Sequence, residues 1–106
     1  MDEITPQLRE IFGIYGFRLN QLGIHIDEHR DFNDLSGLYE IIPKDGKEVV
    51  ALLNHDEMTG SFRIDLYRDY LLKEIKWAAA NVRATLERRC DVRFPGVRKS
   101  DRVLME

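Results

Sequence analysis

The stretch LYEIIPKDGKEVVALLNHDEMTGSFRIDL, residues 38–66, decides the fold of this chain. Asp45-Gly46 lies between two apolar runs, and Asp-Gly in that setting is a strong short-range signal for a β-hairpin. The run Val49 to Leu53 is nearly continuous and predicts a central strand buried on both faces. Residues 54–60 are polar and predict a turn, after which apolar and polar residues alternate strictly, as in a strand with one buried face. The stretch therefore predicts three antiparallel strands, at residues 38–42, 49–53 and 62–67.

Apolar spacing predicts a helix before these strands. Thr5-Pro6 suits its start, because Thr caps free N–H groups and Pro is preset for the first helical position. Apolar residues then recur at spacings of three and four up to Leu22, and Gly23 is the expected C-cap. Alternation at residues 22–27 predicts a short edge strand, and the polar stretch Asp27 to Ser36 predicts a loop.

A second, longer helix is predicted after the strands, from a cap at Asp69 to about Arg89. Its core face is expected to consist of apolar residues one turn apart: Leu71, Leu72, Ile75, Ala78, Ala79, Val82 and Leu86. Pro95-Gly96 is a turn signal, so residues 91–106 are expected to form an irregular tail. The predicted fold is one α+β domain over residues 1–106. It has two layers, an antiparallel meander sheet of three to four strands and both helices on one of its faces.

Composition limits the class of protein. The chain has 106 residues, of which 43% are hydrophobic and 33% are charged, as in a single globular domain. No apolar run approaches the roughly 20 residues of a membrane span. The start, Met1 to Glu3, is acidic where a secretory signal is basic, so a cytoplasmic protein without a membrane partner is expected. The single cysteine, Cys90, forms no disulfide framework and is expected to be structural.

The net charge of −3 is unevenly distributed. Residues 1–60 carry 12 acidic and 5 basic side chains, whereas residues 61–106 carry 7 acidic and 11 basic ones. The segment from Arg88 to Arg102 is the most basic, with six basic residues and two acidic ones. Such a segment either pairs with the acidic half of the chain, remains solvated, or binds an anionic partner.

The sequence contains no complete catalytic pattern. His25 to His29 reads H-x-x-E-H, a zinc motif whose two histidines share a metal when they lie one helical turn apart. On a strand the same residues lie about 13 Å apart, too far for one ion. A looser site of both histidines and His55, with Asp56 or Glu57, would make the protein a metal-dependent enzyme, and this is the third hypothesis. Otherwise no catalytic residue, cofactor or metal site is predicted, and a non-enzymatic protein is expected.

The second predicted helix carries large side chains opposite its core face. Tyr70, Trp77 and Ala84 are spaced by seven, with Ala80 and Arg88 near them, where a surface helix is normally polar. A partner protein, a second copy, the first helix or the tail would cover this face. The first hypothesis is a small adaptor, chaperone or inhibitor that binds a protein partner or itself through these five residues.

Residues 73–80, KEIKWAAA, resemble the second helix of double-stranded-RNA-binding domains, which commonly reads K-K-x-A-K-x-x-A-A. The order helix, three strands, helix is also similar. The resemblance gives Lys73 and Lys76 the family's role of binding phosphates across a groove. Leu72 stands where the family's first lysine sits, and residues 66–70 replace its glycine- and serine-rich turn. Nucleic-acid binding is the second hypothesis, through Lys73, Lys76, Arg88, Arg89, Arg93, Arg98 and Lys99.

Overall fold

The computed structural model describes residues 4–22 and 37–94 of the chain. In order, the described elements are α1 (Ile4–Ile14), β1 (Phe17–Leu22), β2 (Leu38–Pro43), β3 (Ala51–Asp56), β4 (Ser61–Leu66), α2 (Leu72–Leu86) and β5 (Cys90–Arg93). All the described strands form one sheet, in the order β1-β2-β3-β4-β5. Neighbouring strands are antiparallel, except that β4 and β5 are parallel. The predicted α+β class is confirmed, but the sheet is mixed and has five strands.

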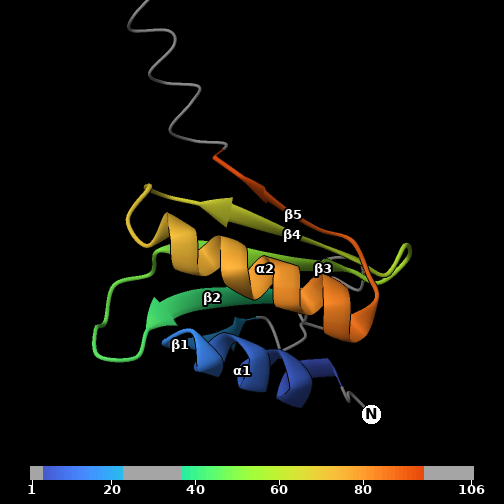
Figure 1. The fold of residues 1–106 in the computed structure, drawn as a ribbon, viewed down its shortest axis with the longest axis horizontal. Helices are drawn as coiled ribbons and strands as arrows, with labels where there is room; N and C mark the ends of the chain where they lie inside the picture. Colours follow the sequence, from blue (N-terminus) through green and yellow to red (C-terminus); the bar gives the residue numbers. More distant parts are fainter. Residues whose placement is uncertain (1–3, 23–36, 95–106) are drawn as a thin grey trace, which may run out of the picture.

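Both helices lie on the same face of the sheet (Figure 1). Side chains alternate between the two faces of a strand, so every second strand residue points into the space between the layers. The core consists of these residues and of one stripe from each helix: Leu8, Ile11, Phe12, Phe17, Leu19, Tyr39, Ile41, Val50, Ala51, Leu53, Phe62, Ile64, Leu66, Ile75, Ala78, Ala79, Val82 and Cys90. The other face of the sheet is not covered by a described helix, and we call it the open face.

Helix α1 ends before the predicted Leu22, and that prediction is wrong. Gly16 takes a left-handed backbone with φ +91°, which turns the chain directly into β1. The Gly13 carbonyl at the helix end accepts a hydrogen bond from the Gly16 N–H and another from Lys44 Nζ, each 3.2 Å long. Leu19 and Leu22, which were predicted to lie on the helix, belong to β1. Their positions in this strand happen to continue the spacing of three and four residues found in the helix. The expected cap at Gly23, the rest of the edge strand expected at residues 22–27 and the loop expected from Asp27 to Ser36 lie outside the described residues. Leu22 itself ends β1.

The central hairpin is confirmed, with shifted boundaries. Asp45-Gly46 lies in the loop between β2 and β3, which are antiparallel, and β3 is the middle strand of the sheet. β3 begins at Ala51 and runs to Asp56, so the turn predicted at residues 54–60 is limited to residues 57–60. The prediction that this strand is buried on both faces is wrong. Both helices cover the same side of the sheet, so Leu52, on the other side, is partly exposed.

Helix α2 has the predicted core face but different ends. Ile75 and Val82 are fully buried, as are Ala78 and Ala79 between them. The helix begins at Leu72 without a side-chain cap, so the predicted cap at Asp69 is wrong. Residues 71 and 87, on either side of the helix, have left-handed backbone, with φ of 61° and 58°. Glu87 therefore ends the helix before the predicted Arg89, and its N–H donates to the Arg83 carbonyl at 2.9 Å.

Strand β5 corrects the prediction of an irregular tail from residue 91. After β4, helix α2 crosses the sheet and returns the chain parallel to β4, which is the geometry of a βαβ unit. Cys90 pairs with Phe62 and Val92 with Ile64, so both point toward the helices. Residues 95–106 of the predicted tail lie outside the described residues.

The outer edge of β5 is partly occupied by a side chain of α2. The Arg89 carbonyl accepts a hydrogen bond of 2.7 Å from the Phe62 N–H of β4. Successive carbonyls of a strand point in opposite directions, so that of Cys90 points away from β4. Arg83 Nη1 donates to this Cys90 carbonyl at 2.7 Å. Helix α2, which precedes β5 in the chain, therefore also provides a hydrogen-bond donor for a backbone carbonyl on the outer edge of β5.

Candidate functional site

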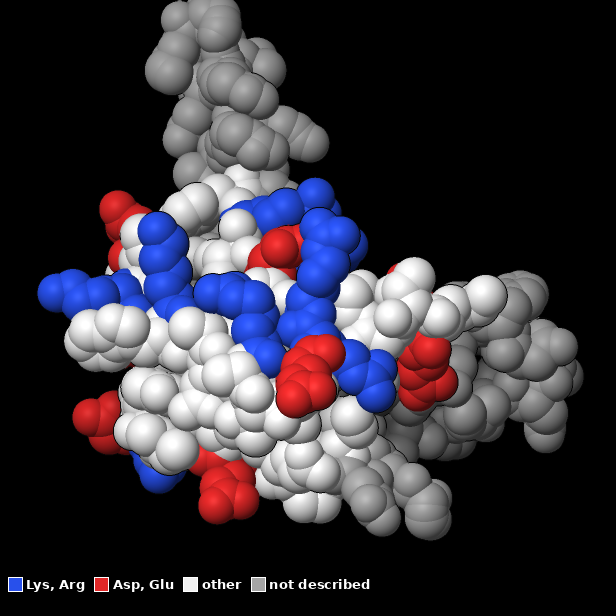
Figure 2. All heavy atoms as spheres, turned by 45° about the vertical axis from the view of Figure 1, so that its right-hand side comes forward, with Lys and Arg blue, Asp and Glu red and all other residues white. Residues whose placement is uncertain are grey.

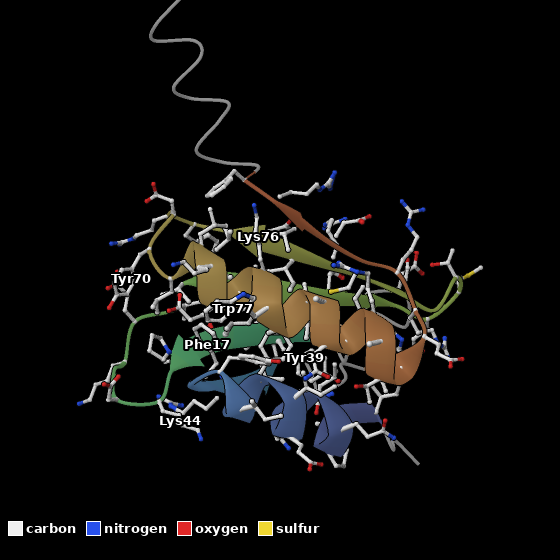
Figure 3. All side chains as sticks on the ribbon, viewed as in Figure 1. Phe17, Tyr39, Lys44, Tyr70, Lys76 and Trp77 are labelled. Atoms are coloured by element: carbon white, nitrogen blue, oxygen red, sulfur yellow. The ribbon has the colours of Figure 1, made fainter. Side chains whose placement is uncertain are left out.

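The side of α2 that faces away from the sheet carries exposed aromatic residues. The structure leaves 51% of Trp77 and 59% of Tyr70 exposed, and Ala80 and Ala84 are exposed as well. Figure 3 shows Tyr70 near the start of α2 and Trp77 on the side of the helix nearer α1. We call these four residues the Trp77 surface.

Trp77 is held in place by neighbours on both helices. Its ring lies 6.4 Å from that of Tyr15, at the end of α1, with an interplanar angle of 44°. Lys73 Nζ lies 5.9 Å from the centroid of the Trp77 ring, within cation–π range. Asn81 Nδ2 donates a hydrogen bond of 3.0 Å to the Tyr15 hydroxyl, which holds the Tyr15 ring beside Trp77. One alternative was that the first helix covers this face of α2. The first helix covers it only in part, because Tyr15 contacts the Trp77 ring while 51% of Trp77 stays exposed.

Arg88 lies beyond the end of α2. Its Nη1 donates to the Gly60 carbonyl at 3.4 Å, at the turn between β3 and β4. Gly60 is buried with φ +78°, and a side chain there would overlap the Arg88 guanidinium. Among the five predicted partner-binding residues, four share the Trp77 surface, while Arg88 packs against a turn.

The residues predicted to bind nucleic acid fall on different faces. Lys and Arg gather over the half of the molecule that holds α2 and β5 (Figure 2), and Lys76 lies on the side of α2 nearer β4 and β5 (Figure 3). Lys73 and Lys76 are exposed on the helix layer. Because Cys90 points toward the helices, alternation places Arg89 and Arg93 on the open face. The remaining two predicted residues, Arg98 and Lys99, lie outside the described residues.

The metal site of the third hypothesis lies largely outside the described residues. His55 lies on β3 and stacks on Phe62, with ring centroids 4.6 Å apart and an interplanar angle of 18°. His25 and His29 lie outside the described residues. Within residues 4–22 and 37–94, no three His, Cys, Asp or Glu side chains are grouped to hold a metal ion.

Cys90 is a core residue, fully buried beneath α2. Burial raises the pKa of its thiol to about 12, with Arg83 opposing the rise and Asp91 adding to it. The folded state therefore favours the neutral thiol, which is a poor nucleophile and a poor metal ligand.

The buried Cys90 thiol predicts a loss of stability at alkaline pH. In the unfolded chain its pKa is near 9.0, so the folded state holds the proton more tightly. This contribution is complete below pH 9 and falls by about 1.4 kcal/mol per pH unit as the pH rises toward the folded pKa. Urea unfolding of the native protein and of Cys90→Ala at several values between pH 7 and pH 11 measures it. The native protein should lose stability faster than the variant above pH 9, and parallel losses would contradict the prediction.

Sequence reasoning missed Tyr15 as part of the site, because its helical spacing assigned it to the core. It also missed the charged cluster on the open face at Arg63 and Asp65, since alternation identified those residues only as solvent-facing. No short-range signal indicates that Trp77 meets Tyr15, which lies 62 positions earlier in the chain.

Two further findings bear on the function of this chain. In the part of the chain that the structure describes, no helix is long and apolar enough to cross a membrane. Comparison with protein-family models, with curated proteins and with solved structures finds no match for this chain.

Proposed function

We propose that this protein is a small non-enzymatic binding module, of the adaptor, chaperone or inhibitor type, that docks a protein partner on the Trp77 surface. The exposure of Trp77 is the observation that carries the proposal. Half of this large apolar side chain remains in contact with solvent, although α2 contributes its other face to the core. Trp and Tyr are the residues most often found as anchors of protein interfaces.

The surroundings of Trp77 suit an anchor. Contacts with Tyr15 and Lys73 hold the indole in one orientation, so binding sacrifices little side-chain entropy. Ala80 and Ala84 are small, which allows an element of the partner to approach the helix closely. The exposed indole and the two alanines together form an apolar centre of the kind found in protein interfaces.

Charge indicates the chemistry of the partner. Lys73 and Lys76 border the apolar centre, and Figure 2 shows further basic residues over α2 and β5. A partner with an apolar pocket and an acidic rim complements this arrangement, whereas a second copy would bring like charges together. We therefore favour a heterologous acidic partner over a homodimer.

The test compares partner binding by the native protein, by Trp77→Arg and by Met58→Arg. Met58 is 90% exposed at the turn between β3 and β4, so its variant adds the same charge away from the Trp77 surface. Proteins captured by the native chain are purified and titrated against all three. Loss of binding in Trp77→Arg alone supports the proposal, and equal binding by all three proteins would refute it. Light scattering over a concentration series shows whether a second copy, with a mass of twice 12.5 kDa, is the partner instead.

Nucleic-acid binding is the alternative, supported by the basic residues over α2 and β5 in Figure 2. Under this alternative, affinity for a 20-base-pair RNA duplex falls steeply with salt, because bound phosphates release counterions. Replacing Lys73 and Lys76 with Gln should then reduce the slope of log K against log salt by about 2. Fluorescence anisotropy at several salt concentrations measures the slope. No binding, or an affinity indifferent to salt, would eliminate the alternative.

A further inference from the structure

The open face of the sheet contains a hollow of about 290 Å³ at strands β3, β4 and β5. Its lining residues are Asn54, Asp56, Ser61, Phe62, Arg63, Arg89, Asp91 and Arg93. Strand register explains why charged side chains meet there. Arg63 lies between Asn54 and Asp91 on the adjacent strands, and Asp65 lies beside Arg93 in the next row. The hollow is on the side of the sheet away from both helices, and therefore away from the Trp77 surface.

One carboxylate, that of Asp65, lies beside two guanidinium groups in this region. Arg63 Nε donates to both oxygens of Asp65, at 3.1 and 3.2 Å. Arg93 Nε lies 3.9 Å from Oδ1 of the same carboxylate. The Asp65 side chain is only 14% exposed, whereas those of Arg63 and Arg93 are 43% and 54% exposed. Asp65 thus hydrogen-bonds Arg63 and lies within ion-pair distance of Arg93 on the adjacent strand, and both arginines remain accessible to a ligand.

The contacts with Asp65 leave the terminal N–H donors of both arginines available. A guanidinium has five N–H donors in a planar fork, and the Asp65 contacts use only Nε of Arg63 and of Arg93. The described structure shows no partner for the terminal nitrogens of either group. Two positive charges face one negative charge here, so an excess of one positive charge remains.

The other charges of the hollow are engaged with each other or with the backbone. Arg89 pairs with Asp91 at 3.3 Å. Asp56 accepts a hydrogen bond of 3.0 Å from the Met58 N–H, at the far end of β3. Asp56 keeps its negative charge, so the lining groups and Asp65 together carry three positive and three negative charges. The positive excess is local, at Arg63 and Arg93, and lies at the end of the hollow away from Asp56.

We propose that this hollow binds the phosphate group of a small phosphorylated molecule between Arg63 and Arg93. Phosphate offers several acceptor oxygens and nearly two negative charges at neutral pH, so it can accept hydrogen bonds from two guanidinium forks at once. A carboxylate has only two oxygens, so it can accept a bidentate pair of hydrogen bonds from only one guanidinium group. Asn54, beside Arg63, adds a neutral amide donor at the wall of the hollow. The volume suits a group of this size better than a large cofactor.

The experiment is a titration with inorganic phosphate, followed by amide chemical shifts in NMR at pH 7.5 and constant ionic strength. We expect saturable shifts confined to β3, β4 and β5, with a Kd on the order of a millimolar because the probe is small. Acetate and chloride are titrated in parallel at matched charge concentration. Acetate binding to the same amides as tightly as phosphate would overturn the assignment to phosphate, as would the absence of saturable shifts.

Three variants test the residues. Arg63→Gln and Arg93→Gln should each raise the Kd for phosphate by about 10-fold or more, since each removes charge-assisted hydrogen bonds. Arg9→Gln removes the same charge from the exposed surface of α1 and should leave the Kd unchanged. Arg93 lies on the edge strand, so its variant remains informative if Arg63→Gln fails to fold. An equal weakening by Arg9→Gln would show attraction by general charge and would overturn the site.

Discussion

Trp77→Arg is expected to weaken partner binding by roughly 30-fold or more while the domain stays folded. Truncation of a central aromatic anchor typically costs about 2 kcal/mol or more of binding free energy. Arginine removes the apolar anchor and adds a third positive charge beside Lys73 and Lys76, which leaves the acidic rim of the partner attracted but its pocket empty. The fold should survive, because 51% of Trp77 is already exposed.

Calorimetric titration and thermal unfolding together check this prediction. Trp77 is the single tryptophan of the chain, so its fluorescence reports directly on the surface in the native protein. A blue shift of its emission on partner binding would show that the indole becomes buried in the complex. Unfolding of Trp77→Arg at the temperature where the native protein is stable would instead show that Trp77 belongs to the core. Met58→Arg should match the native protein in both measurements.

Phe12→Ala is expected to cost about 3–5 kcal/mol of unfolding free energy, the usual cost of removing a buried aromatic side chain. Phe12 is fully buried and is one of the α1 residues that join this helix to the sheet. Its ring packs edge-on against Phe17, with centroids 6.4 Å apart and an angle of 66°. Because small domains are stable by only about 5–15 kcal/mol, the variant should be partly unfolded under mild heating.

Urea unfolding followed by circular dichroism measures this loss. Ile14→Ala is the matched control, since Ile14 lies on the same helix but is 64% exposed. Its cost should stay within about 0.5 kcal/mol, as for most surface substitutions. Equal losses in the two variants would mean that α1 does not pack on the sheet through Phe12.

Short-range signals were sufficient for those parts of the fold that local chemistry controls. The Asp45-Gly46 hairpin, the alternation in β4 and the core stripe of α2 all follow from patterns within a few residues. The end of α1 did not, because apolar residues of β1 happened to continue the helical spacing. Only the left-handed backbone at Gly16 separates the two elements.

Strand β5 shows a different limit of the sequence. Cys90 to Phe94 does alternate apolar and charged residues, but five residues give a weak pattern. The strand exists because α2 returns the chain to the edge of β4, and this pairing joins residues 28 positions apart, such as Phe62 and Cys90. The same long-range pairing separates Arg93 from Lys73 and places it beside Asp65. A linear scan could therefore predict the Trp77 surface, which lies on one helix, but not the arginine pair of the open face.

The hydrogen bond from Arg83 to the Cys90 carbonyl also bears on how this protein behaves at high concentration. A bare edge strand is a template on which another chain can add a strand and begin a fibril. At β5 an incoming strand would have to displace a guanidinium from that carbonyl before it could pair. Arg83→Ala would remove this barrier without touching the core, so the variant should aggregate at lower concentration than the native protein. Growth of the sheet by strand addition at β5 is thus opposed by a side chain of the helix that precedes this strand.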